Sequence, residues 1–240
     1  MKRLWPSFLP KNMLRPIAVL SCMGVFVAVA NWVLPWQFLI MRNAILWNVF
    51  LAALPLAFAC LIALAVKQGF RWYGQVILWL LWIGFYPNVI YMLTDLIHLN
   101  IRQYVFEGDF TTNPRTWFAL MHLVAAIVVG CGFGLLSLWL LHRITAKKNV
   151  ALGWALAVGA SGLSGIGIWI GRCLRFNTWD IWQRPFHLIQ EIFQQIDRRA
   201  VFLCLVFAAM SCGAYALVYG DVIEWLYTKD MGKDLAAGFD

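Results

Sequence analysis

Residues 44–66 read AILWNVFLAALPLAFACLIALAV, a run of 23 residues without a single Asp, Glu, Lys or Arg. About twenty apolar residues cross the hydrocarbon core of a bilayer as a helix. A helix of a soluble protein keeps one polar face toward water, and this stretch has none. The run therefore predicts a membrane-spanning helix.

Five further apolar stretches of similar length occur, and the composition agrees with a membrane setting. Of the 240 residues, 62% are apolar and 12% are charged, whereas soluble domains are about 25% charged. The 14 Trp residues suit the membrane interface. We expect an all-α, polytopic transmembrane bundle that forms one domain over residues 1–240. The predicted spans are residues 16–34, 44–66, 73–93, 116–141, 150–170 and 200–219.

The basic residues lie mostly between the apolar stretches, where they set orientation. Eleven of the 19 Lys and Arg residues fall on the side that holds both termini, and eight fall on the other side. The positive-inside rule then places both termini in the cytoplasm of a multi-pass cell-membrane protein. Membrane anchoring also explains the net charge of +8, so membrane lipids are the expected partners and nucleic acid is not.

The loop between the fifth and sixth predicted spans has a helical pattern of its own. Pro185 suits a helix start. Apolar residues then recur at steps of three and four, with polar residues between them: Phe186, Ile189, Phe193 and Ile196. Residues 185–199 are therefore predicted to form an amphipathic helix in the outer interface, before the last span.

Two glycine-rich stretches, residues 130–134 and 162–171, contain small residues spaced four apart. This spacing lets helix backbones approach closely in lipid. Packing within one chain and a face for a second copy are both consistent with it, and the sequence does not fix an oligomeric state.

A polar stripe marks the outer half of the third predicted span. Pro87 kinks the helix, and at 100° per residue four polar side chains after it share an arc of about 80°: Asn88, Tyr91, Asp95 and His98. Such a stripe faces the bundle interior or a wet cavity. Asp95 and His98, with His122 at similar depth, are candidate metal ligands; the alternative is that Asp95 and His98 bond each other or an arginine.

A second polar cluster follows the fifth predicted span. Arg172 and Arg175 share a helix face if the helix continues, and Asn177 and Asp180 suit the start of a following turn. Paired guanidinium groups suit a carboxylate or a phosphate. The alternative is that these arginines anchor the helix end at lipid headgroups or pair with Asp95 or Asp180. Because both clusters follow outward-running spans, we expect Asp95 and His98 within reach of residues 172–175.

These motifs resemble a known family. Residues 86–99 (YPNVIYMLTDLIHL) and 171–180 (GRCLRFNTWD), with the earlier stretch 46–52 (LWNVFLA), are similar to signatures of a bacterial membrane family catalogued as domain of unknown function 1361. The resemblance implies a bacterial multi-pass membrane protein. It implies no activity, cofactor or catalytic residue.

Three functions compete at this stage. The first is an outward-facing pocket for an anionic or lipid-linked substrate, with Asn88, Tyr91, Arg172, Arg175, Asn177 and Asp180 as binding residues and Asp95 and His98 as acid–base candidates. The second is a non-catalytic membrane subunit whose polar cluster locks helices together. A proton-relay transporter is disfavoured, because the other spans carry almost no ionisable groups.

Overall fold

The computed structural model describes residues 13–33, 42–98, 114–176 and 183–236, and these residues form helices and no strands. Six helical stretches are long and apolar enough to cross a membrane, and each matches one predicted span. The predicted fold class is confirmed. The six are α1 (Leu14–Val33), α2 (Arg42–Lys67), a third span made of α3 (Trp72–Phe85), α4 (Asn88–Tyr91) and η3 (Met92–His98), α6 (Pro114–Ala146), α7 (Val150–Arg172) and α10 (Arg198–Ala236).

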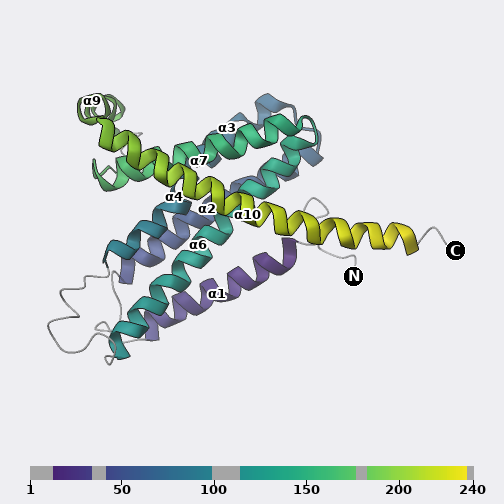
Figure 1. Cartoon of the computed structure of the whole chain (residues 1–240), viewed down its shortest axis with the longest axis horizontal. Helices are drawn as coiled ribbons and strands as arrows, with labels where there is room; N and C mark the ends of the chain where they lie inside the picture. Colours follow the sequence, from purple (N-terminus) through teal and green to yellow (C-terminus); the bar gives the residue numbers. More distant parts are fainter. Residues whose placement is uncertain (1–12, 34–41, 99–113, 177–182, 237–240) are drawn as a thin grey trace.

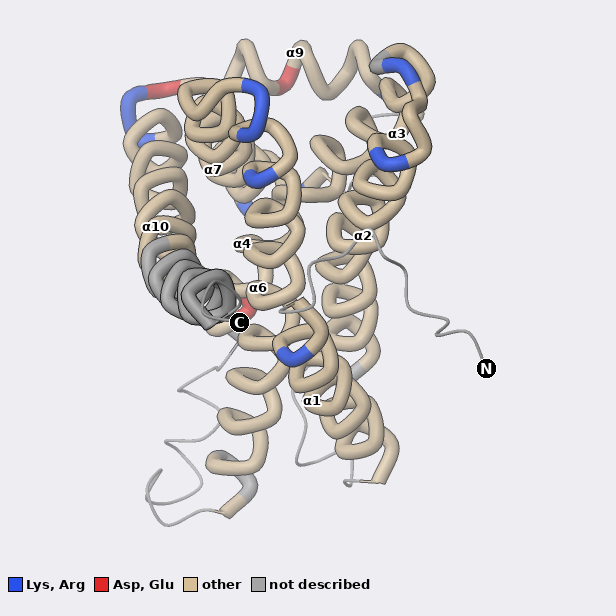
Figure 2. The backbone as a smooth tube through the Cα atoms, turned by 90° about the vertical axis from the view of Figure 1, so that its right-hand side faces the viewer, with Lys and Arg blue, Asp and Glu red and all other residues tan. Residues whose placement is uncertain are grey.

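The spans run between two ends of the bundle (Figure 1). The start of α1 and the α2–α3 and α6–α7 connections lie at one end, and α9 (Pro185–Gln195) lies at the other. We call the second the α9 end. Charged residues are sparse along the helix bodies and gather near helix ends (Figure 2), as expected where the flanks of each span rest against lipid.

The central span is α6. In its most apolar 18-residue stretch 61% of residues are buried, whereas the corresponding share is 11% in both α1 and α10. The helix packs against α1, α2, α7 and η3. Its Ser137 accepts a hydrogen bond from the indole nitrogen of Trp82 at 3.2 Å. The main apolar cluster fills the space around this contact.

Glycines set close approaches between helices of the chain. A Cβ on Gly165 would overlap the backbone carbonyl of Cys204, so α7 and α10 meet there backbone to backbone. A Cβ on Gly171 would lie 2.7 Å from the ring of Tyr91. Gly162 has open space around it. Packing within the chain thus accounts for Gly165 and Gly171.

The kink predicted at Pro87 is present, as a break in the α-helix. The α-helix ends at Phe85, resumes for one turn after Pro87, and continues from Met92 as the 3₁₀-helix η3. The polar stripe was predicted on the assumption of α-helical spacing. In the 3₁₀-helix η3, residues three apart lie directly above one another instead. Met92 and Asp95 therefore share a face of the backbone.

The amphipathic helix exists, but it is shorter than predicted. It ends at Gln195, and α10 starts at Arg198. Asp197 explains the boundary, since its carboxylate accepts a hydrogen bond from the backbone nitrogen of Ala200 at 2.7 Å and so caps α10. Arg198 and Arg199 consequently belong to the first turn of α10. That α9 lies in the outer interface stays a prediction.

α9 exposes large apolar side chains beside its polar ones. Leu188 is buried against the bundle, whereas Phe186 and Phe193 are 86% and 77% exposed. In Figure 1 the helix is seen nearly end-on, so it runs across the direction of α10. This exposure pattern is typical of a helix that rests on a membrane surface.

Candidate functional site

Asp95 is buried in the third span near the α9 end of the bundle. Its side chain is 2% exposed, although it lies in an otherwise apolar span. A carboxylate at such a position requires paired or hydrogen-bonded partners, because lipid supplies none. The break at Pro87 and the tighter winding of η3 determine where Asp95 faces.

The main partner of Asp95 is Arg172, the last residue of α7. Its terminal Nη2 donates to Asp95 Oδ1 and forms a salt bridge. Its Nε donates to the hydroxyl of Thr94, and its Cζ lies 4.0 Å from the centre of the Tyr91 ring. The predicted meeting of the two polar clusters is therefore present between Asp95 and Arg172. The third span and α7 are joined through a guanidinium whose charge persists in a low dielectric.

A second hydrogen-bond partner of the carboxylate is Asn48 of α2. Its amide nitrogen donates to Asp95 Oδ2 at 2.8 Å. Both carboxylate oxygens thus accept a hydrogen bond, one from α7 and one from α2. We call this arrangement of Asn48, Asp95 and Arg172 the three-helix clamp. Sequence analysis did not assign Asn48 to the site, although an amide inside an apolar span is the kind of signal that indicates one.

The other predicted residues lie as follows. Tyr91 supplies the ring under Arg172. Asn88 donates to the carbonyl of Phe85 at 3.0 Å, across the helix break. Arg175 is exposed and has a φ of 61°, at the turn after α7. The side chain of His98 and all of Asn177 and Asp180 lie outside the described residues.

His122 contacts α1 rather than a residue of the clamp in the hydrogen bond that its ring makes. It is buried in α6, and its Nε2 lies 3.3 Å from the carbonyl of Val27 in α1. Among the side chains that the structure describes, no three His, Cys, Asp or Glu residues come close enough to hold one metal ion. Because the side chain of His98 is outside the described residues, the set of Asp95, His98 and His122 stays a prediction.

The clamp is closed in this conformation. Each oxygen of Asp95 already accepts a hydrogen bond, from Arg172 or Asn48, and the side chain is 2% exposed, so a substrate has no open path to the carboxylate. A general acid or base needs to reach the proton that it transfers. As it stands, the clamp is suited to holding α2, the third span and α7 together.

A groove lies beside the clamp, between the end of α7 and the start of α10. Its volume is about 530 Å³. We call it the α7–α10 groove. One part of its lining carries two arginines and the carboxylate of Asp197, and the other part is mostly apolar. The lining residues are Trp169, Cys173, Asp197, Arg198, Arg199, Ala200, Phe202 and Leu203.

The groove is directly connected to the clamp through α7. Cys173, which is exposed in the groove, follows Arg172 in the chain. The two arginines of the groove are exposed as well. Arg198 and Arg199 were predicted to belong to the amphipathic helix, so they were not among the predicted site residues. The signal for their position was Asp197, a helix cap directly before two basic residues.

The fold, the apolar spans and the clamp define the class: this is a multi-pass helical membrane protein. Residues 47–213 match the family described as "Protein of unknown function (DUF1361)". The match covers more than half of the chain, and the protein belongs to this family. No curated protein and no solved structure matches the chain. The matched region includes the clamp and the α7–α10 groove, and it leaves out α1.

Proposed function

We propose that this membrane protein binds the anionic group of a membrane-anchored ligand, such as a phosphorylated lipid headgroup, in the α7–α10 groove. The observation that carries the proposal is the pair Arg198 and Arg199 on the rim of a groove of about 530 Å³. Arginine suits phosphate, because its planar fork donates two parallel hydrogen bonds. Arg175, exposed at the turn after α7, is a third candidate cation.

The position of the groove favours a ligand with a lipid part. Its basic rim lies at the first turn of α10, and Phe202 and Leu203 extend the lining into the apolar part of that span. A phospholipid could therefore place its phosphate at the arginines and its hydrocarbon chains against Phe202 and Leu203. The neighbouring helix α9 exposes apolar side chains that suit the same membrane surface.

Orientation is part of the proposal. With both termini in the cytoplasm, the α9 end and its groove face the outside of the cell. The excess of basic residues on the side of the termini supports this orientation. An outward groove would receive a ligand from the outer leaflet.

The three-helix clamp has a positioning role in this proposal. Arg172 holds the last turn of α7, and the next residue, Cys173, lines the groove. An acid–base role for Asp95, with His98, would require Arg172 or Asn48 to release the carboxylate first. Binding of an anion in the groove requires no such opening.

A second candidate function is a non-catalytic membrane subunit, and the closed clamp favours it. A buried ion pair with both oxygens satisfied serves to fix helices, whether or not a ligand binds. In that case the arginines of the groove would only anchor α10 at the membrane surface.

Protection of Cys173 distinguishes the two functions. The purified protein is alkylated in detergent with and without short-chain phosphatidic acid, and the rates at Cys173 and Cys22 are followed by mass spectrometry. Both cysteines are exposed, but only Cys173 lines the groove. We expect phosphatidic acid to slow the reaction at Cys173 through the arginines of the groove, whereas any change at Cys22, which lies in α1, should not depend on those arginines. Inorganic phosphate alone tests whether the lipid part is needed.

Matched variants make the outcome specific. Arg198→Gln/Arg199→Gln should abolish the protection, whereas Arg184→Gln, which removes an exposed arginine before α9, should retain it. Equal rates at Cys173 with and without phosphatidic acid, in a wild-type protein that elutes as a single species, would rule out the binding proposal. The non-catalytic membrane subunit would then be the remaining candidate function.

A further inference from the structure

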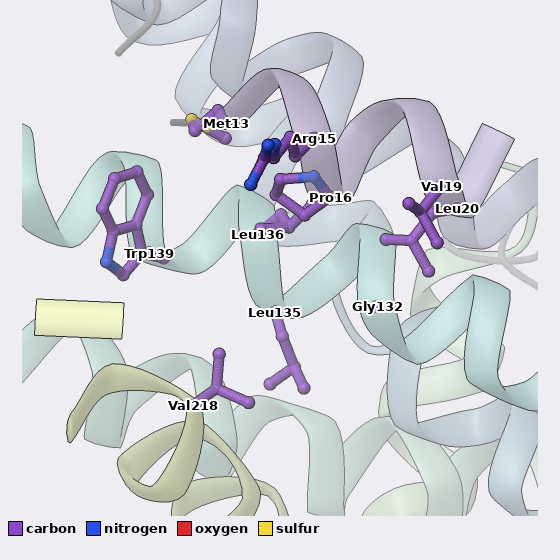
Figure 3. A pocket seen from close by; sticks show the side chains of 10 residues that line it. All are labelled: Met13, Arg15, Pro16, Val19, Leu20, Gly132, Leu135, Leu136, Trp139 and Val218. Carbon is purple, nitrogen blue, oxygen red and sulfur yellow. The ribbon is translucent and has the colours of Figure 1, made fainter. Parts of the chain in front are cut away.

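The opposite end of the bundle carries a second crevice, between α1, α6 and α10. Its volume is about 470 Å³. Arg15, Trp139 and Val218 surround the space from the three helices (Figure 3). Apart from Arg15, every lining residue is apolar or glycine: Met13, Pro16, Val19, Leu20, Gly132, Leu135, Leu136, Trp139 and Val218. We call it the α1 crevice.

The α1 crevice lies within one leaflet of the membrane. Arg15 is in the first turn of α1, where that span begins. At 1.5 Å per residue, the lining from Gly132 to Trp139 is about 10 Å long, and half of the hydrocarbon core is about 15 Å thick. The crevice therefore reaches from the membrane surface most of the way to the midplane.

Charge is concentrated at the surface end of the crevice. Arg15 is exposed on its rim, and Arg143 lies with its Cζ 5.4 Å from the ring of Trp139. The salt bridges between described residues join Arg172 to Asp95 and His187 to Glu191, so Arg15 has no carboxylate partner among them. Basic groups above an apolar crevice between spans match a lipid with an anionic headgroup.

The crevice also separates a weakly held helix from the rest of the bundle. In the most apolar stretch of α1, only 11% of residues are buried. The helix also lies before the region that matches the family. On the other side of the crevice, α6 lies wholly within that region, whereas α10 enters it only as far as residue 213, before Val218. An occupant of the crevice would therefore contact α1 and the family core at once.

We propose that the α1 crevice binds one anionic phospholipid, with an acyl chain between α1, α6 and α10 and the headgroup phosphate at Arg15. The lipid thereby attaches α1 to the bundle. This inference does not depend on the α7–α10 groove, which lies at the other end of the molecule.

Native mass spectrometry of the detergent-purified protein tests the inference. The protein is mixed with phosphatidylglycerol or phosphatidylcholine of identical chains, and the bound lipids are counted. We expect retention of one phosphatidylglycerol in preference to phosphatidylcholine. Arg15→Gln should reduce that preference about fivefold, the effect of one basic residue near an anionic headgroup. Arg71→Gln, an exposed arginine at the α2–α3 connection, should leave it unchanged.

A filling variant tests the apolar part separately. Val19→Trp occupies the crevice and should displace the lipid, whereas Val29→Trp should not, because Val29 does not line the crevice. The two valines are 57% and 53% exposed on the same helix, so they are matched for tolerance of a larger side chain. Arg198→Gln/Arg199→Gln should also retain this lipid.

Three results would overturn the inference. One is equal retention of the two lipids by the wild type. Another is undiminished phosphatidylglycerol binding by Val19→Trp. The third is a Val19→Trp protein that changes its oligomeric state while its lipid count stays constant, which would make the crevice a contact between two copies.

Discussion

The salt bridge between Asp95 and Arg172 joins residues 77 positions apart and brings two polar motifs to one point inside a membrane bundle. Asn48 adds a third helix through the other carboxylate oxygen. Asp95 is almost completely buried, so its partners replace the water that a carboxylate would otherwise require. The clamp therefore couples the positions of α2, the third span and α7.

Asn48 provides a first test, because it bonds the carboxylate without carrying charge. Asn48→Ala removes one hydrogen bond to Asp95 and should cost about 1–3 kcal/mol in the free energy of unfolding. Asn48→Asp should cost more, since it places a second carboxylate beside Asp95. Unfolding in detergent measures both variants. Wild-type stability in Asn48→Asp would contradict the contact.

Tyr91 tests the ring under the guanidinium. Tyr91→Phe retains the aromatic face 4.0 Å from Arg172 and should have little effect on stability. Tyr91→Leu removes that face and should cost about 0.5–2 kcal/mol, the range of a cation–π contact. The measurement is the thermal midpoint of each variant. Equal midpoints for Phe and Leu would show that the ring only fills space.

Gly165 tests the backbone contact between α7 and α10. Gly165→Ala should separate the two helices and destabilise the protein by about 1–3 kcal/mol, because the new methyl group meets the rigid backbone of Cys204. Gly162→Ala is the control on the same helix. Its Cβ meets open space, so it should be neutral or slightly stabilising. An equal loss of stability in both variants would mean that alanine destabilises α7 itself and that the contact with Cys204 is not the cause.

Orientation is tested by labelling single cysteines in intact cells with a membrane-impermeant maleimide. The exposed native Cys22 and Cys173 are first replaced by serine. Gln194→Cys in α9 should then be labelled, and Lys148→Cys at the α6–α7 connection should be protected until the cells are opened. Both positions are exposed in the structure. The reverse pattern would place the α7–α10 groove in the cytoplasm.

Much of the fold follows directly from the sequence, because lipid imposes a strict rule on span length and polarity. The six spans appear where the apolar stretches predict them. Pro87 interrupts its helix because it lacks an amide hydrogen and its ring crowds the preceding turn, although Pro55 lies inside the uninterrupted α2. The contact between Asp95 and Arg172 was also predictable, since a buried carboxylate requires a partner and few were available at that depth.

Other features depend on tertiary packing and could not be derived in the same way. The 3₁₀ winding of η3 changes which residues share a face, and nothing in the local sequence distinguishes it from an α-helix. Asn48 joins the clamp because α2 packs beside the third span. The α1 crevice exists only because three helices diverge around it. Such relationships are set by packing between helices rather than by the pattern within one.

The central claim is that Asp95 and Arg172 form one energetic unit, and a double-mutant cycle tests it most directly. Unfolding free energies are measured for the wild type, Asp95→Asn, Arg172→Gln and the double variant. We predict that the double variant loses less stability than the sum of the single losses, by at least about 1 kcal/mol, because either single change leaves a buried partner unsatisfied. Single losses that add within about 0.5 kcal/mol would contradict the clamp.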